Sequence, residues 1–586
     1  MEHPVLRMFQ VYAWRHRASF LAGSVCLVLT NYLTVSIPTQ IGAAIDTLAA
    51  GAAAGVPGHA LNIALMGAAV IVVRTLSRVL FFNPGRDMEY ALRGDLFSRL
   101  LAQQPTFYAG RQTGDIVSRA SNDISWTRAL VGFGTLQAVN VLLAVPLTFW
   151  KMFEISVTLS LAALVPISLG IVIAQLAIRR IFPLMRRNQE QLGELSSHVL
   201  ESVQGIASIQ GFVAEDAFEE RFEHKNQAWF ITGMKMAVIR TMAFPLLGFA
   251  GGVSLFLLLY VGGPMAVEGT LSVGDIAAFA TLLAALLPPL RSMGFMLSVW
   301  QRGRAALERI FELMDAPIER PEGTTPTPGA PGRGPQIELR DLSFSYPDKP
   351  DEAVLSEVSF TIPAGSTVGI FGRTGSGKST LTRLLSRLYN PPEGAIFVDG
   401  TDIRDLGLDG WRERLAVVPQ RPFLFSDSIA ANISLSDTPD LDPVSAAAAL
   451  AALDADLTAL PDGLQTVVGE RGIMLSGGQR QRVALARGLF RQADLVVLDD
   501  VLSAVDHDNE AKLVATLAGL SESERAQTTV IISNRLSAFR YASLIAVLDE
   551  GRLVDLGTHE DLAARPGIYR DTWLVQQDEQ SKDVAG

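Results

Sequence analysis

The sequence predicts two folded parts in series: an all-α domain of six membrane-spanning helices, followed by a soluble α/β domain. Six long runs without Asp, Glu, Lys or Arg occupy the first 300 residues. A Pro- and Gly-rich segment at 315–336 ends this region, and short β-rich runs then alternate with helical stretches. The composition agrees, because a chain of 586 residues with 49% hydrophobic and 19% charged residues exceeds one soluble domain.

Each uncharged run can hold the ~20 residues that a helix needs to cross a bilayer. The runs are 18–45, 47–73, 129–150, 155–178, 241–267, and 276–290 with 292–301. Arg15 and Arg17 precede the first run as in a signal peptide, but the run is too long and five more follow it. We therefore expect an uncleaved transmembrane domain at 1–314.

The distribution of Lys and Arg predicts the orientation. The connections 47–60 and 261–274 contain neither, whereas the alternate connections are rich in Arg. The positive-inside rule then places both termini in the cytoplasm of a multi-pass protein of the cell's inner (cytoplasmic) membrane. The charged segments between spans 2 and 3 and between spans 4 and 5 carry i to i+4 charge pairs, which predicts long helices projecting from the membrane.

The remainder is organised as a linker at 315–336, a soluble domain at 337–575 and a polar, flexible tail at 576–586. The β-rich runs are Gln336 to Phe344, Ser366 to Phe371, Leu415 to Val418, Leu495 to Leu498, Thr528 to Ile532 and Leu544 to Leu548. The net charge is −11, with the acidic excess after residue 320, so nucleic acid is not an expected partner. The single cysteine, Cys26, excludes an intramolecular disulfide and a Cys-based metal site.

A phosphate-binding loop, Gly372-Arg-Thr-Gly-Ser-Gly-Lys378-Ser379, lies between a β-rich run and a helical run. In such a loop backbone N–H groups wrap the phosphates, the lysine adds a charge, and the hydroxyl of Ser379 ligates Mg²⁺. ATP and Mg²⁺ are therefore the expected cofactors. The expected nucleotide-binding residues here are Gly372, Thr374, Gly375, Ser376, Gly377, Lys378, Ser379 and Thr380.

Leu475-Ser-Gly-Gly-Gln479, with this loop and the six preceding spans, resembles the ATP-binding cassette (ABC) transporters of the exporter type. The resemblance covers nearly the whole chain and identifies 337–575 as the ABC nucleotide-binding domain. It implies that Tyr346 stacks on adenine, that Gln420 contacts Mg²⁺ and the attacking water, and that Asp499 holds Mg²⁺. It also implies a metal site made of Ser379, Gln420 and Asp499, a D-loop at Ser503–Asp506, and a loop at Thr466–Gly472 that touches the membrane domain.

Two segments of the membrane domain resemble the family's cytoplasmic coupling helices. One is Thr113–Arg119 with Asp123, and the other is Gly205–Glu215. An ordinary solvated helix face is the alternative for each segment taken alone. Their order relative to the cassette favours coupling helices.

Two positions depart from the family pattern. Asp500 stands where a glutamate usually polarises the attacking water, and Asn534 stands where a histidine senses the γ-phosphate. Aspartate is one methylene shorter, and a misplacement on the order of 1 Å can cost about 10²-fold in rate. Asparagine cannot carry a positive charge or take up a proton. A tolerated substitution without functional effect is the alternative.

In this family two cassettes pair head to tail, so the signature of one chain closes the ATP of the other. Ser476, Gly477, Gly478 and Gln479 are intact here. The resemblance therefore implies the degenerate-site subunit of a heterodimeric multidrug exporter, whose partner is a homologous half-transporter with the usual catalytic Glu and His. The expected cargo is a hydrophobic drug, lipid or peptide.

Two other functions remain open at this point. One is a homodimeric exporter with a weak, Asp500-based ATPase, and the other is a non-transporting ATP-gated membrane receptor or channel. Importer function is disfavoured by the fused spans. Several polar residues and methionines in the spans are open to two interpretations, as cavity lining or as helix packing: Asn31, Gln40, Gln137, Asn140, Met242, Arg291, Met293, Met296 and Trp300.

Overall fold

The computed structural model describes residues 3–318, 323–329, 332–469, 472, 474–501, 513 and 527–585. The chain forms two compact units. Unit 1 consists of Met1–Leu101 and Thr113–Ala316, and unit 2 of Ala102–Gln112 and Pro317–Gly586. The short segment Ala102–Gln112, which lies inside the predicted domain 1–314, thus groups with the soluble part.

Within the described residues, unit 1 contains six helical segments long and apolar enough to cross a membrane, which confirms the predicted number. These segments are Pro4–Ala49, Ala53–Leu101, Thr113–Ile155, Val157–Gln204, Phe249–Val267 and Val273–Met314. Their elements are α1 (Pro4–Met8), α2 (Arg17–Ala49), α3 (Val56–Leu101), α5 (Thr113–Ser118), α6 (Ile124–Ala129), α7 (Thr135–Ile155), α8 (Val157–Gln204), α9 (Ile206–Gly211), α10 (Glu215–Val267) and α11 (Val273–Met314), with short π and 3₁₀ turns between some of them.

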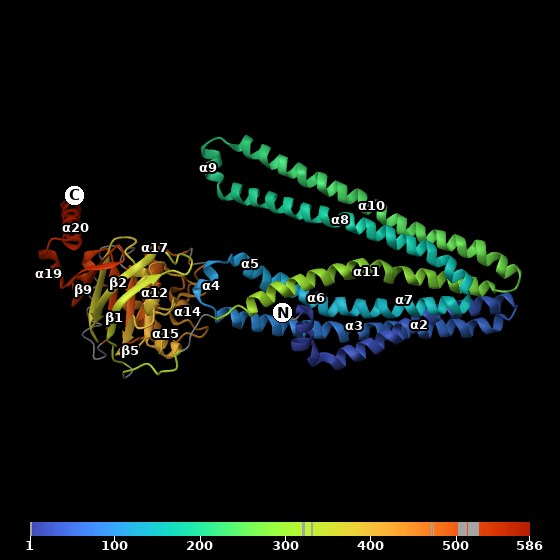
Figure 1. Ribbon diagram of the computed structural model, residues 1–586, viewed down its shortest axis with the longest axis horizontal. Helices are drawn as coiled ribbons and strands as arrows, with labels where there is room; N and C mark the ends of the chain where they lie inside the picture. The colour runs from blue at the N-terminus through green and yellow to red at the C-terminus, as the bar shows by residue number, and fades with distance from the viewer. Residues whose placement is uncertain are drawn as a thin grey trace. The chain divides into compact units, whose positions relative to one another are not determined.

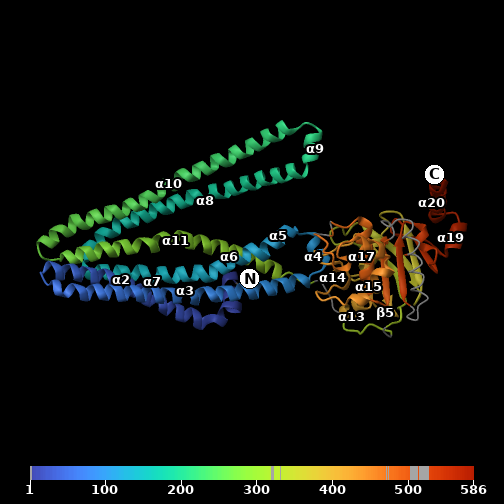
Figure 2. The same ribbon diagram turned by 180° about the vertical axis from the view of Figure 1, so that it is seen from behind.

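The predicted long helices are present as α3, α8 and α10. They contain 46, 48 and 53 residues. At 1.5 Å per residue such helices are roughly 70–80 Å long, more than twice the ~30 Å of bilayer hydrocarbon. Helix α8 packs along α10 with α9 joining their ends, while α2, α3, α7 and α11 lie side by side (Figures 1 and 2).

One polar contact joins the end of α2 to the start of α11. Asp46 accepts hydrogen bonds from Ser272 Oγ at 2.6 Å and from the backbone N–H of Gly274 at 2.8 Å. Ser272 is itself the N-cap of α11, in a capping box with Asp275. A side chain at Gly274 would collide with the carbonyl of Gly42, so the two helices meet backbone to backbone.

Unit 2 contains ten strands among its described residues. They are β1 (Ile337–Ser345), β2 (Ala353–Ile362), β3 (Thr367–Gly372), β4 (Ile396–Val398), β5 (Thr401–Asp402), β6 (Leu415–Val418), β7 (Leu495–Asp499), β8 (Thr528–Ser533), β9 (Leu544–Asp549) and β10 (Arg552–Gly557). All six predicted β-rich runs are strands. Strands β2, β4, β5 and β10 were not predicted from the sequence, and each occurs only in antiparallel pairs.

Unit 2 also contains helices among its described residues. They are α4 (Pro105–Ala109), α12 (Lys378–Leu385), α13 (Leu408–Glu413), α14 (Ile429–Ser434), α15 (Leu441–Leu450), α16 (Asp454–Ala459), α17 (Gly477–Phe490), α19 (His559–Ala564) and α20 (Ile568–Ala585), with the 3₁₀ turns η6 (Gly463–Gln465) and η9 (Leu536–Phe539).

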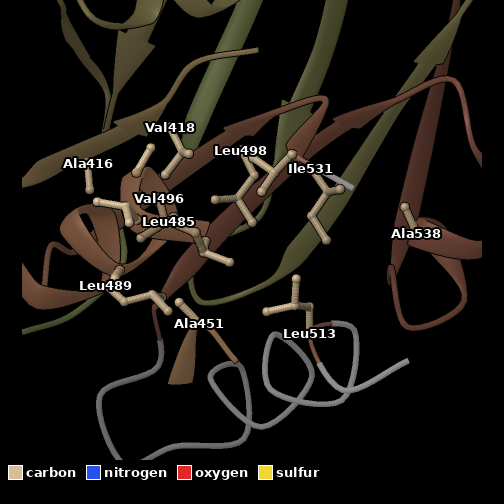
Figure 3. Packing of buried hydrophobic residues seen from close by; sticks show 14 of the residues in the cluster. Ala416, Val418, Ala451, Leu485, Leu489, Val496, Leu498, Leu513, Ile531 and Ala538 are labelled. Atoms are coloured by element: carbon tan, nitrogen blue, oxygen red, sulfur yellow. The ribbon is translucent and has the colours of Figure 1, made fainter. Parts of the chain in front are cut away.

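The strands form two sheets. One has four strands in the order β2-β1-β4-β5, and the other has six in the order β10-β9-β3-β8-β7-β6. The central strands of the larger sheet are parallel and buried on both faces, since alternate residues of β7 enter two different cores. Val496 and Leu498 pack with Leu485 and Leu489 of α17 on one face (Figure 3). This arrangement confirms the predicted fold class, an all-α transmembrane domain followed by an α/β domain.

The segment that the sequence predicts as a linker is attached to unit 2 at several points. Thr325 pairs with Leu406 and exchanges backbone hydrogen bonds with Asp405 and Gly407. Arg414 forms a buried ion pair with Asp494, and Arg414 also donates to the carbonyl of Pro328. The predicted flexible tail begins at Gln576, which the structure includes in α20.

Candidate nucleotide site

The candidate site lies at the carboxyl ends of four adjacent strands. The order β3-β8-β7-β6 places the phosphate-binding loop, Asn534, Asp499 with Asp500, and Gln420 beside one another, because each follows or ends one of these strands. All four strands are parallel, so their carboxyl ends meet at the same edge of the sheet. Ligands of open α/β sheets bind in the crevice at this edge.

The phosphate-binding loop adopts a backbone that its glycines make possible. Gly375 and Gly377 have φ values of 89° and 93°, in the left-handed region. A Cβ at Gly377 would lie 2.6 Å from Cδ2 of Leu355 and 2.9 Å from the carbonyl oxygen of Val354. Thr374 and Gly375 are exposed at the tip of the loop, Ser376 is buried, and Lys378 begins α12. The loop therefore leads into a helix N-terminus, where backbone N–H groups can bind an anion.

The ammonium group of Lys378 is held over this loop. Its Nζ donates to the carbonyl oxygens of Gly372 at 2.7 Å and Arg373 at 2.8 Å. Burial lowers the pKa of Lys378, and the nearby carboxylates of Asp500 and Asp499 act in the opposite direction. The geometry places a positive charge where the phosphates of a bound nucleotide would lie.

The residues expected to hold Mg²⁺ form an oxygen-rich group. Burial raises the pKa of Asp499, and a hydrogen bond from Ser379 opposes that shift. Gln420 lies next to Asp500, and its Nε2 donates to Oδ2 of Asp500 at 3.1 Å. A carboxylate, a hydroxyl and an amide are the hard oxygen donors that Mg²⁺ prefers, so these three residues fit the ion.

Asp500 and Asn534 lie on neighbouring strand ends. Asp500 has a φ of 53°, and its N–H donates to the carbonyl of Ile532 at 2.8 Å. Asn534 follows β8 directly and is exposed. The structure thus brings both departures from the family pattern to the edge that carries Lys378.

Tyr346 lies against the start of α12. Its hydroxyl is 2.9 Å from Thr380 Oγ1 and accepts from Arg383 Nη1 at 2.8 Å. The ring packs edge to face with Phe344 and Tyr389, at centroid distances of 5.3 and 5.1 Å. An aromatic surface beside the phosphate-binding helix suits a nucleobase. The roles of Phe344 and Tyr389 in this aromatic group were not predicted from the sequence, because no recognisable spacing links them to Tyr346.

The signature residues form the start of another helix. Ser476 is the N-cap of α17 and forms a reciprocal capping box with Gln479. Gln479 Nε2 also donates to Asp456 Oδ1 at 3.1 Å, and Asp456 is paired with Arg482. Ser476 and Gly477 are exposed, while Gly478 is half-buried. None of the hydrogen bonds found for these described residues reaches the phosphate-binding loop of the same chain.

Two further predicted loops lie wholly or partly outside the described residues. The D-loop Ser503–Asp506 lies outside the described residues. In the loop Thr466–Gly472, residues 466–469 and 472 are described, and the N–H of Val468 donates to the carbonyl of Asp427 at 2.9 Å.

The two predicted coupling segments occupy different settings in unit 1. In the first, Asp115 pairs with Arg119 of the same segment at 2.8 Å and with Arg309 of α11 at 2.5 Å. The second contains α9, after which Phe212 and Val213 are 86% and 84% exposed. An ion network therefore ties the first segment to α11, whereas the second presents apolar side chains outward.

Some polar residues of the spans form hydrogen bonds between helices, and one such pair is partly buried. Asn31 Nδ2 donates to Oδ1 of Asn140 at 3.1 Å, which joins α2 to α7. Gln40 Oε1 is 3.2 Å from Nδ1 of His59, in α3. These contacts favour the helix-packing interpretation for Asn31, Gln40 and Asn140. The side chain of Arg291 lies outside the described part of the chain.

Comparison with known proteins identifies both units. The family profile described as "ABC transporter transmembrane region" matches residues 20–290, and that described as "ABC transporter" matches residues 355–503. A probable multidrug resistance ABC transporter ATP-binding/permease protein, YheI of Bacillus subtilis (strain 168), is 34% identical over 96% of this chain and 97% of its own length. The multidrug resistance-like ATP-binding protein MdlA of Escherichia coli (strain K12) is 32% identical over 99% of this chain and 98% of its own.

Lipid transporters and a solved structure are similar as well. The ATP-dependent lipid A-core flippase of Yersinia pestis is 32% identical over 82% of this chain and 81% of its own. A solved bacterial Atm1-family ABC exporter with ATP bound superposes with a TM-score of 0.78, at 28% identity, over 96% of this chain and 98% of that one. The six apolar helices, the strand-edge nucleotide site and these matches together show that the chain belongs to the ABC transporter family, as an exporter half-transporter with its own transmembrane and ATP-binding domains.

Proposed function

We propose that the chain is one subunit of a heterodimeric ATP-driven exporter in which it holds ATP at a slow site and completes a fast site on its partner. The observation that carries the proposal is a contrast within unit 2. Asp500 and Asn534 occupy the ends of β7 and β8 beside Lys378, whereas the capping box of Ser476 and Gln479 leaves the start of α17 intact and exposed.

The slow site is assigned to this chain's own loop. Lys378 and the glycine backbone would bind the phosphates, Tyr346 would support the base, and Asp499 with Ser379 and Gln420 would hold Mg²⁺. Bound Mg²⁺ would neutralise charge on the phosphate oxygens. Asp500 is one methylene shorter than glutamate and Asn534 is uncharged, so water at this site would be poorly activated.

The transport cycle follows from differential binding. Two ATP molecules would join the paired cassettes, and coupling segments at Thr113–Arg119 and Gly205–Glu215 would pass the closure to twelve pooled spans. ATP must bind the closed state more tightly than the open one, since otherwise it would shift no equilibrium. The names of the relatives support a hydrophobic drug or a lipid as cargo, with peptides as the third class that the sequence allows. The positive-inside pattern supports an inner-membrane location with both termini in the cytoplasm.

Two substitutions in this chain test the proposal. Asp500→Ala removes the carboxylate beside its own loop, and Gly477→Asp places a carboxylate at the exposed start of α17. A Cβ at Gly477 would meet no atom within 4 Å, and an acidic residue in the first turn of a helix is favourable, so Gly477→Asp should fold. Gly477→Ala is the matched control.

The full chain would be purified from membranes with the subunits that accompany it, and these would be identified by mass spectrometry. We expect Asp500→Ala to change steady-state ATP turnover by less than about twofold and Gly477→Asp to abolish it. Abolition by both would favour a homodimer with an Asp500-based ATPase, whose specific support is the Gln420–Asp500 hydrogen bond. ATP turnover without substrate accumulation in inverted vesicles would favour the receptor or channel.

A further inference from the structure

One side chain of the C-terminal helix α20, that of Gln576, forms two hydrogen bonds to the loop that contains Asn534. Gln576 Nε2 donates to the backbone carbonyl oxygen of Asn534 at 3.0 Å, and Gln576 Oε1 accepts from the N–H of Leu536 at 3.0 Å. A single amide therefore uses its donor and its acceptor on residues 534 and 536, on both sides of Arg535. From the sequence, Gln576 was predicted to lie in a flexible tail.

The part of α20 before Gln576 is anchored in the core of unit 2. Tyr569 is 2% exposed, and its ring packs edge to face on Phe371 at a centroid distance of 5.3 Å. Phe371 is the residue before the first glycine of the phosphate-binding loop, and it also packs against Phe539 in η9 at 6.3 Å. Phe371 thus links Tyr569 of α20 to the turn that follows Asn534.

The helical spacing places Gln576 on the same face of α20 as the buried residue Tyr569. Tyr569, Trp573 and Gln576 are separated by four and three residues, so they lie on one face of α20. On this face the ring of Trp573 is 4.7 Å from that of His559, and the ring nitrogen Nδ1 of His559 is 2.7 Å from the hydroxyl of Tyr569. The position of the Gln576 amide is therefore fixed by buried aromatic contacts two turns earlier.

We propose that Gln576 is a positioning residue for the nucleotide site, which holds the Asn534 loop in the conformation that recognises the γ-phosphate. It acts through the backbone of residues 534 and 536 and does not touch the nucleotide. The inference rests on the proposed role of Asn534 at the nucleotide site. An unclamped loop would have to be ordered when ATP binds, and that entropic cost would weaken ATP binding.

The two hydrogen bonds from Gln576 to the Asn534 loop, here called the clamp, should affect the binding of ATP and of ADP differently. ATP carries the γ-phosphate that the Asn534 loop would meet, whereas ADP lacks it. Loss of the clamp should therefore weaken the binding of Mg-ATP and leave that of Mg-ADP unchanged. General destabilisation of unit 2 would weaken both nucleotides alike.

Three variants of the full-length chain test the inference. Gln576→Met keeps the length of the side chain and removes both hydrogen bonds. Gln576→Glu keeps an acceptor for the N–H of Leu536 but replaces the donor to Asn534 with a carboxylate that faces a carbonyl oxygen. Gln577→Met is the matched control, because Gln577 is the exposed neighbour on the same helix.

Two measurements on the purified chain in detergent give the result. Hydrogen exchange should increase in a peptide covering residues 533–540 for Gln576→Met and Gln576→Glu but not for Gln577→Met. Affinity for Mg-ATP should fall roughly five- to tenfold, the effect of one to two neutral hydrogen bonds, with affinity for Mg-ADP unchanged.

Unchanged exchange at 533–540 would overturn the clamp itself, and equal losses for ATP and ADP would overturn its role with the γ-phosphate. Neither outcome bears on the proposed slow and fast ATP sites, which the comparison of Asp500→Ala with Gly477→Asp tests separately.

Discussion

At the scale of single residues, the nucleotide site combines an intact binding apparatus with two altered positions. Lys378, Asp499 and Ser379 are joined by hydrogen bonds and by charge at the carboxyl ends of β3 and β7. Asp500 is held at the same edge by its backbone bond to Ile532 and by Gln420. Under the proposed function, binding of ATP and hydrolysis of ATP would therefore be separable at this site.

Lengthening Asp500 should accelerate hydrolysis at this chain's own site. Asp500→Glu restores one methylene, which brings the carboxylate within reach of a water at ~2.6–3.2 Å. We expect a gain of about tenfold in hydrolysis at this site, below the ~10²-fold that full alignment can give, because Asn534 remains uncharged. Photo-crosslinking 8-azido-ATP to the chain and separating the retained ATP and ADP measures the gain. Asp500→Asn is the control, and equal rates for Glu and Asn would refute the explanation.

At the scale of elements, the backbones of α2 and α11 are in close contact where Gly42 faces Gly274. Gly274→Ala should destabilise unit 1 by about 1–3 kcal/mol, because the added methyl group would displace the Gly42 carbonyl and the carboxylate of Asp46. Thermal unfolding of the purified protein followed by loss of monodispersity would show a lower midpoint. Gly252→Ala in α10 is the control, since a Cβ there meets no atom within 4 Å. A shift as large in the control would contradict the packing argument.

The junction of α19 and α20 should be sensitive to acid. Burial lowers the pKa of His559 from its ordinary value of 6.5. Below 6.5 the unfolded chain binds a proton that the folded chain excludes, so this contribution to stability is complete above that pH and is lost as the pH falls through the lower folded value.

We expect the urea midpoint of unit 2 in the wild-type protein to decrease between pH 7.5 and pH 5.5, and the decrease to be smaller for His559→Gln. Tryptophan fluorescence at the two pH values measures both. An identical decrease in the two proteins would assign the acid sensitivity to other groups.

At the scale of the whole molecule, the proposed orientation places the connection after α2 and the connection after α10 outside the cell, and α9 inside. The single cysteine makes this testable, because Cys26→Ser gives a background without cysteine. Single cysteines would then be introduced at the exposed positions Ala52, Ala207 and Glu268.

A membrane-impermeant maleimide added to intact spheroplasts should label the cysteines at 52 and 268 but not at 207, and inverted vesicles should give the opposite pattern. The reverse result in both preparations would invert the topology and exclude the proposed export direction.

The sequence by itself determined the two-part architecture and the six spans, and it located the phosphate-binding loop between a strand and a helix. These follow from local patterns: a run of ~20 uncharged residues has few alternatives to a membrane helix, and a glycine-rich loop between a strand and a helix is built from neighbouring residues. Five of the six predicted strands, β3, β6, β7, β8 and β9, are runs of mainly apolar or β-branched residues, whereas β1 alternates apolar with polar residues. The antiparallel strands β2, β4, β5 and β10 were missed. Strands β4 and β5 have only three and two residues, and β2 and β10 mix exposed with less exposed positions, so each depends on its partner strand.

Only the tertiary structure decided which distant residues meet. The strand order β3-β8-β7-β6 brings Lys378, Asn534, Asp500 and Gln420 to one edge, although up to 156 residues separate them in the chain. The aromatic group around Tyr346, the contact of Asp46 with Gly274, and the hold of Gln576 on the Asn534 loop have no local signal at all. Side-chain hydrogen bonds between remote elements depend on packing, and packing is a property of the folded chain rather than of any segment within it.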